Sequence, residues 1–185
     1  MPDINETIVR HFFELNDFLV RTNVKYWYGS ERGGGDSDID LVVYNLSPDK
    51  LHPPTSFVLT VDEVPGLRQA IVETKGWHTE SFTEGLIRNT PELFNFVRPE
   101  AIATARDKVF HDADFRRVLV LSRLSPVHAN REAAIALLKE GGIDHVIEFD
   151  TIMRFTVDQV EARKNYPDSE ILQTIRLLKV YGVIN

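Results

Sequence analysis

The sequence predicts an α/β domain in which helices flank a mixed central sheet and further helices follow at the C-terminus. The chain has 185 residues, 43% of them hydrophobic and 26% charged, which is the balance of a globular protein with one domain of ordinary size. Residues 117–149 read as strand, helix and strand, and such a β-α-β unit favours parallel strands in a covered sheet. We therefore expect an α/β core over residues 1–150 and a helical extension over 151–185 that packs on it.

Local patterns predict the elements of the first part of the chain. Apolar side chains recur at helical spacing near the N-terminus, and stretches rich in Val, Tyr and Trp alternate with turns that contain glycine or proline. In chain order, we expect a helix over 4–17, extended chain over 18–28, a glycine-rich turn over 29–37, a strand over 39–44, a loop over 45–56, strands over 57–61 and 69–74, and mainly helical structure over 79–110.

The last third of the chain has clearer boundaries. A compact apolar strand over 118–121 precedes Ser125-Pro126, which is typical of the first residues of a helix, and that helix ends at Gly141-Gly142. A strand over 145–149 follows, and Asp150 is expected to cap a helix that runs to about Arg163. Pro167-Asp168-Ser169 is expected to open a final helix, which Gly182 ends.

Composition excludes several classes of protein. The chain has no cysteine, so it forms neither disulfides nor thiolate metal sites. Its apolar runs are far shorter than the roughly 20 residues that span a bilayer, and the N-terminus lacks the pattern of a secretory signal. We therefore expect a cytoplasmic protein with no membrane partner. Residues 1–100 carry 9 basic and 16 acidic side chains, which concentrates the net charge of −7 in the first half.

Two segments place charged residues on otherwise apolar strands. Asp40 begins the run Leu41-Val42-Val43, and Glu73-Thr74-Lys75 follows Ile71-Val72. Strand alternation puts Glu73 and Lys75 on one face, and Asp40 approaches Glu73 if the two strands are neighbours. Two carboxylates that share a site repel each other, and Mg²⁺ or Mn²⁺ relieves that repulsion. Lys75 beside them would orient or help to deprotonate a water molecule bound to the metal.

These two segments resemble the signature of the PD-(D/E)XK nuclease superfamily, most closely its Mrr-like and Holliday-junction-resolvase-like members. The resemblance covers roughly residues 4–150 and implies a restriction-endonuclease-like core and Mg²⁺- or Mn²⁺-dependent hydrolysis of DNA. We also expect a homodimer, because two strands are commonly cut by paired sites and the C-terminal helices offer an apolar face. The resemblance also implies roles for individual residues: Asp40 and Glu73 as metal ligands with the Thr74 carbonyl, Glu14 on the preceding helix as a further ligand, and Lys75 as the residue that positions water. The sequence departs from the superfamily at Ile39, where proline often precedes the aspartate.

Other functions fit parts of the same sequence. Gly29-Ser30 followed by Asp38 and Asp40 is similar to the polymerase-β-type nucleotidyltransferases, which would use the two aspartates for Mg²⁺ and the Gly-Ser turn for a triphosphate. Against this interpretation, residues 31–37 contain three consecutive glycines and are a poor helix, although that family usually has a helix there. A non-catalytic binding module with the nuclease fold is a third hypothesis. Asp38 fits a structural residue of a turn as well as it fits a metal ligand. Glu14 also fits an exposed acid on a helix that has no role in the site.

Overall fold

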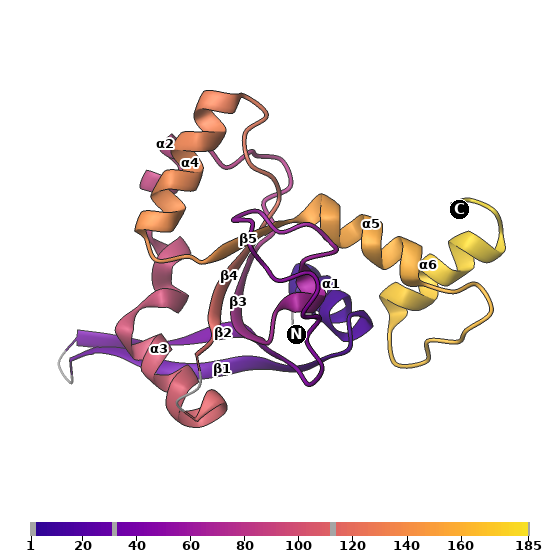
Figure 1. The fold of residues 1–185 in the computed structure, drawn as a ribbon, viewed down its shortest axis with the longest axis horizontal. Coiled ribbons are helices and arrows are strands. Elements are labelled where there is room, and N and C mark those ends of the chain that lie inside the picture. Colours follow the sequence, from indigo (N-terminus) through magenta and orange to yellow (C-terminus); the bar gives the residue numbers. More distant parts are fainter. Residues whose placement is uncertain (1–2, 31–32, 112–113, 185) are drawn as a thin grey trace.

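The computed structural model describes residues 3–30, 33–111 and 114–184. It confirms an α/β fold around one five-stranded mixed sheet with the strand order β1-β2-β3-β4-β5 (Figure 1). The first three strands form an antiparallel meander, and β3, β4 and β5 run parallel, as the β-α-β pattern predicted for the last two. The strands are β1 (Phe18–Ser30), β2 (Gly33–Asn45), β3 (Gln69–Lys75), β4 (Arg116–Leu121) and β5 (His145–Glu148).

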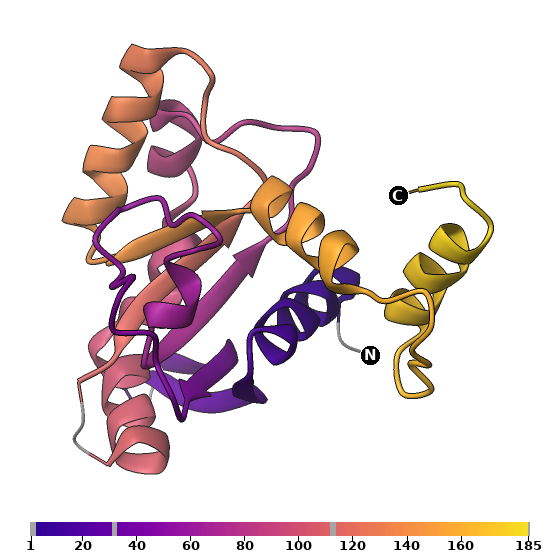
Figure 2. The same cartoon turned by 45° about the vertical axis from the view of Figure 1, so that its right-hand side comes forward.

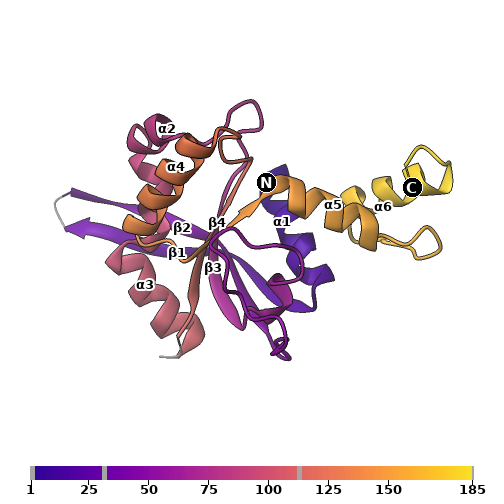
Figure 3. The same cartoon turned by 45° about the horizontal axis from the view of Figure 1, so that its top comes forward.

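Helices cover both faces of the sheet, and each face has its own apolar core. One core lies under α2, α3, α4 and a 3-10 turn, and the other lies under α1 and the start of α5. Figures 2 and 3 show this layering, with α6 farther from the sheet, beyond α5. The helices are α1 (Ile4–Leu15), α2 (Glu84–Arg88), α3 (Pro99–Ala105), α4 (His128–Glu140), α5 (Phe149–Gln159) and α6 (Glu170–Val180), with 3-10 turns at Val64–Gly66 and Pro91–Val97 and a π-helical turn at Arg106–Phe110.

Partway along the β1-β2 hairpin, the alternation of side chains between the two faces of the sheet is interrupted. Asp40 lies at this position. Val20 packs with the α1 core, whereas Val24, four residues later on the same strand, packs with the opposite core. Asn23 between them has a φ of 54°, in the left-handed region that asparagine tolerates better than most residues. Its cross-strand position in the register is that of Asp40. The left-handed backbone at Asn23 therefore interrupts the regular strand pairing at Asp40.

Asn23 gives a test of this geometry. Asn23→Val is expected to lower the free energy of unfolding by about 1–2 kcal/mol, because a left-handed backbone places the Cβ of most residues against the following carbonyl. Asn23→Gly, which has no Cβ, should keep nearly the wild-type value. Chemical denaturation of the two variants measures the difference. An equal loss in both would show that the asparagine side chain, and not the backbone conformation, is what matters there.

Several predicted boundaries were wrong. The glycine-rich stretch predicted as a turn over 29–37 is largely strand, because β1 ends at Ser30 and β2 begins at Gly33; residues 31–32 lie outside the described part. The strand predicted over 57–61 is a single parallel bridge between Val58 and Val146. Ser125 and Asp150 do not cap helices, since α4 begins at His128 and α5 at Phe149.

The C-terminal helix packs against the ends of α1 and α5 through a third apolar cluster, which consists of Val160, Tyr166, Leu172 and Ile175 with Leu15 and Val157 against them. The final helix begins after Pro167-Asp168-Ser169, as predicted. Ser169 caps it by accepting a hydrogen bond from the Leu172 amide at 3.2 Å, and its hydroxyl is also hydrogen-bonded to His11 Nε2 at 2.7 Å. Because His11 belongs to α1, this contact ties the extension to the first helix. The predicted boundary at residue 150 falls at the start of α5, whose Ile152 packs in the α1 core. Among the described residues, no helix is long and apolar enough to cross a bilayer.

Candidate functional site

The structure brings Asp40, Glu73 and Lys75 together at the carboxyl end of β3. The register pairs Leu41 with Val72, so the next residues outward are Asp40 and Glu73. At this position the backbone pairing between β2 and β3 ends. The Thr74 amide donates instead to a side chain, to Asp40 Oδ2 at 2.7 Å. Lys75 Nζ donates to Glu73 Oε1 at 2.6 Å. Glu73 and Lys75 thus form an ion pair, and Asp40, held by the Thr74 amide, lies close enough for its charge to act on both; these three residues are called the cluster.

Glu73 is the most unusual member of this cluster. Its side chain is only 7% exposed, and its second oxygen, Oε2, is buried without a hydrogen-bond partner. Burial, followed by repulsion from Asp40, raises the pKa of Glu73 to about 8, although Lys75 acts in the opposite direction. A buried carboxylate oxygen with no partner is costly, so this atom calls for a proton or a cation.

The pKa values of Asp40 and Lys75 are shifted by the same surroundings. Burial raises the pKa of Asp40, and the hydrogen bond from the Thr74 amide opposes this effect. For Lys75, burial acts to lower the pKa, but the attraction of Glu73 and the hydrogen bond to it prevail, so the pKa is raised. Lys75 therefore stays a cation at neutral pH. Such perturbed groups in contact with one another are typical of functional sites.

On α1, Glu6 is the carboxylate whose pKa responds to the charges of the cluster. Burial and then the charge of Asp40 raise the pKa of Glu6, with Lys75 acting in the opposite direction. Glu14 lies about 12 Å farther along the helix, at the rise of 1.5 Å per residue. There its two oxygens accept hydrogen bonds from Arg10 Nε at 2.7 Å and His11 Nδ1 at 3.0 Å. Glu6 therefore replaces Glu14 in the set of candidate site residues.

Topology explains which end of α1 reaches the site. The start of β1 lies at the same edge of the sheet as the start of β3, because Phe18 pairs with Asn45 and Tyr44 with Gln69. The C-terminal end of α1 leads into that edge, so its N-terminal end lies where β3 finishes. Its first turn packs there so closely that a Cβ at Gly76 would collide with the Asn5 side chain.

Negative charge is concentrated around the cluster. Asp38 raises the pKa of both Asp40 and Glu73, and Asp3 raises that of Asp40. Asp38 is itself paired with Lys25 at 3.2 Å, on an exposed part of the hairpin. The acidic excess of the first half of the sequence thus has a structural location, and mutual repulsion favours a bound cation there.

The residues of the alternative nucleotidyltransferase pattern are spread along the hairpin. Lys25 pairs with Asp38 in the register, and Ser30 pairs with Gly33 at the far end of the strands. Ser30 is five residues beyond Lys25, about 16 Å at the rise of a β-strand. Gly29 and Ser30 therefore do not form one pocket with Asp38 and Asp40.

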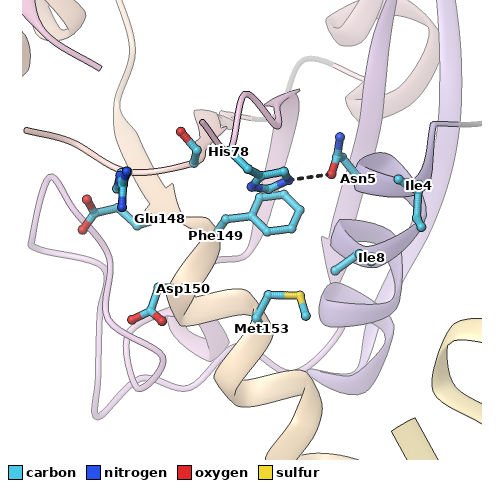
Figure 4. Close-up of a pocket in the computed structure, with 10 residues that line it drawn as sticks. Ile4, Asn5, Ile8, His78, Glu148, Phe149, Asp150 and Met153 are labelled. Atoms are coloured by element: carbon cyan, nitrogen blue, oxygen red, sulfur yellow. Dashed lines mark hydrogen bonds between the residues drawn. The ribbon is translucent and has the colours of Figure 1, made fainter. Parts of the chain in front are cut away.

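Two cavities lie along the edge of the sheet where the parallel strands end. A cavity of about 780 Å³ separates α1 from the start of α5 and has Ile4, Ile8, Phe149 and Met153 among its lining residues (Figure 4). His78 also lines it, donating from Nε2 to Asn5 Oδ1 at 2.9 Å. A second cavity, of about 630 Å³, is lined by Gly76, Trp77, His78, Thr79, Glu80, Leu86 and Thr90.

The donor atoms of the cluster fit a hard cation that keeps part of its hydration shell. Within the described ranges, no three His, Cys, Asp or Glu side chains are arranged around one point as metal ligands. Asp40 and Glu73 supply two carboxylates, and the Oε2 atom of Glu73 has no other partner. Mg²⁺ is commonly held by one or two carboxylates together with water and substrate phosphates. The cluster is compatible with that mode of binding.

Comparison of the chain with protein-family models, with curated proteins and with solved structures gives no match. We therefore infer the function from the geometry and chemistry of the residues at the end of β3.

Proposed function

We propose that the protein is a metal-dependent nuclease that hydrolyses phosphodiester bonds in DNA. The single observation that carries this proposal is the buried Glu73, whose Oε2 atom lacks a partner while its Oε1 atom binds Lys75 beside Asp40. The order of elements supports it as well. A helix precedes the strand of Asp40, and a helical segment, a strand, a helix and a further strand follow Lys75, which is the order that the resemblance to the PD-(D/E)XK nucleases implies.

In the proposed site, Asp40 and Glu73 would hold Mg²⁺ or Mn²⁺ together with the Thr74 carbonyl, and Glu6 would add negative charge nearby. The bound ion would lower the pKa of a coordinated water molecule and offset charge that develops on the phosphate. Asp40 is oriented by the Thr74 amide, which leaves its other oxygen, Oδ1, available. Glu73 is oriented by Lys75 in the same way through its Oε1 atom. Each carboxylate thus keeps one oxygen with which it would hold the ion.

Lys75 acts in this proposal as a fixed cation and not as a base. Because its pKa is raised, the ammonium group keeps its proton at neutral pH. It can hold an attacking water molecule by hydrogen bonding and stabilise negative charge on the phosphate in the transition state. With 21% of its side chain exposed, it is accessible to a substrate.

A metal-dependent cleavage assay tests the proposal. Purified protein is expected to cleave DNA in Mg²⁺ or Mn²⁺, to be inactive with a chelator, and to lose at least about a hundredfold in rate on Asp40→Asn. Asp49→Asn is a matched control, since Asp49 lies in a loop and pairs with His52. Incorporation of labelled nucleotide without cleavage would favour a nucleotidyltransferase instead. DNA binding without either reaction would favour a non-catalytic module.

Self-association belongs to the same proposal. Part of α6 and the residues after it carries exposed apolar side chains that a second copy would cover, namely Leu177, Val180, Tyr181 and Val183. A homodimer would provide two sites for the two strands of DNA, and it remains a prediction.

A further inference from the structure

Trp77 forms a rigid aromatic surface two residues after Lys75. Its indole stacks on the ring of Phe82, with centroids 5.5 Å apart and planes within 5° of parallel. Phe82 is fully buried, and its amide donates to the Arg123 carbonyl at 2.8 Å. Trp77 nevertheless stays 36% exposed and lines the 630 Å³ cavity. One face of the indole is therefore fixed by the core, and the ring surface that Phe82 leaves uncovered is open to the cavity.

The chemistry of this cavity suits a flat ring with polar edges. Trp77 supplies an aromatic surface, and the exposed His78, Thr79 and Glu80 provide hydrogen-bonding groups around it. Gly76, which directly follows Lys75, belongs to the same lining, so the cavity adjoins the end of β3. Stacking on aromatic side chains is how proteins bind unpaired nucleobases without regard to sequence.

We propose that this cavity is a subsite in which an unpaired nucleobase next to the scissile phosphate stacks on Trp77. The inference rests on the proposed nuclease function and narrows its substrate class. A base inside a duplex is stacked on its neighbours and cannot reach the indole. The preferred substrate is therefore DNA with at least one unpaired base beside the cut, as in a single strand, a splayed arm or a junction.

Fluorescence tests the stacking independently of cleavage. The chain has two tryptophans, so Trp27→Phe leaves Trp77 as the only indole. Single-stranded oligonucleotides added in Ca²⁺ are expected to quench its emission, and an abasic site at one position should weaken binding about tenfold. Quenching without any cleavage in Mg²⁺ would support the subsite while the nuclease proposal fails. Cleavage without quenching would overturn the subsite alone, and absence of both would overturn both.

Cleavage rates supply the second test. Wild-type protein is expected to cut splayed-arm DNA about tenfold faster than a blunt duplex of the same sequence, and Trp77→Leu should remove this preference. Trp77→Phe, which keeps an aromatic ring against Phe82, should retain most of it and thereby separates stacking from loss of folding. Trp27→Leu is the matched control, because Trp27 is also exposed but lies on β1. An unchanged preference in Trp77→Leu would refute the subsite.

Discussion

Replacement of Lys75 by methionine is expected to slow phosphodiester cleavage by about two to three orders of magnitude, the usual effect of removing one charged group that stabilises a transition state. Methionine keeps the length of the side chain but has no ammonium group. In the structure this group donates to Glu73 Oε1 at 2.6 Å. Single-turnover cleavage at saturating Mg²⁺ measures the loss, because it separates the chemical step from product release.

A matched control for this substitution is Lys25→Met. Lys25 is also paired with an acid, Asp38, at 3.2 Å, but its side chain is 71% exposed. Exposed ion pairs contribute little, so we expect less than about a twofold change in rate. Equal losses in the two variants would indicate that general electrostatics, and not a specific contact of Lys75, sustains the activity. A Lys75→Met protein with full activity would remove Lys75 from the site.

The second large effect concerns Glu73 and the dependence of stability on pH. Burial, followed by the charge of Asp40, raises the pKa of Glu73 from 4.5 to about 8. Between these values the folded protein binds more protons than the unfolded chain. The contribution of Glu73 is therefore fully present below about pH 4.5 and is lost as the pH rises towards 8, at up to about 1.4 kcal/mol per pH unit.

Glu73→Gln should remove this dependence, since glutamine does not titrate. We expect the variant to be more stable than wild type at pH 8.5, with a Tm higher by several degrees, because about 1 kcal/mol corresponds to roughly 2–4 °C in a chain of this size. Mg²⁺ should raise the Tm of the wild type at that pH much more than that of the variant. Thermal unfolding from pH 5 to pH 9 measures both effects. Parallel curves for the two proteins would exclude a raised pKa at Glu73.

Glu63 provides a control, because its pKa is lowered and its contribution to stability therefore depends on pH in the opposite direction. Despite some burial, which acts to raise its pKa, hydrogen bonds from the Ser56 and Thr60 amides lower the pKa of Glu63 to about 2. Its contribution to stability is therefore present above about pH 4.5 and is lost as the pH falls towards 2. Glu63→Gln should change the acid limb of the stability curve and leave the alkaline limb as in the wild type.

Local sequence patterns were sufficient where the physical cause was local. The apolar run at 118–121 and the glycines after α4 predicted a β-α-β unit, and the structure confirms parallel β4 and β5. Pro167-Asp168-Ser169 was predicted to open the final helix, and in the structure Ser169 caps α6, because its hydroxyl satisfies a free amide in the first turn. Glycine content was a weaker guide, because the cross-strand partners of residues 33–37 hold them in β2.

Charged residues on apolar strands identified Asp40, Glu73 and Lys75 in advance, because a buried charge without a partner is too costly to occur without a reason. The sequence alone therefore determined the fold class and the residue types of the candidate site. Only the tertiary structure decided which acid on α1 responds to their charges, how the left-handed Asn23 interrupts the strand pairing at Asp40, and that Trp77 stays partly exposed while it stacks on Phe82. These features depend on how distant segments meet, and the spacing of residues along one segment does not encode such contacts.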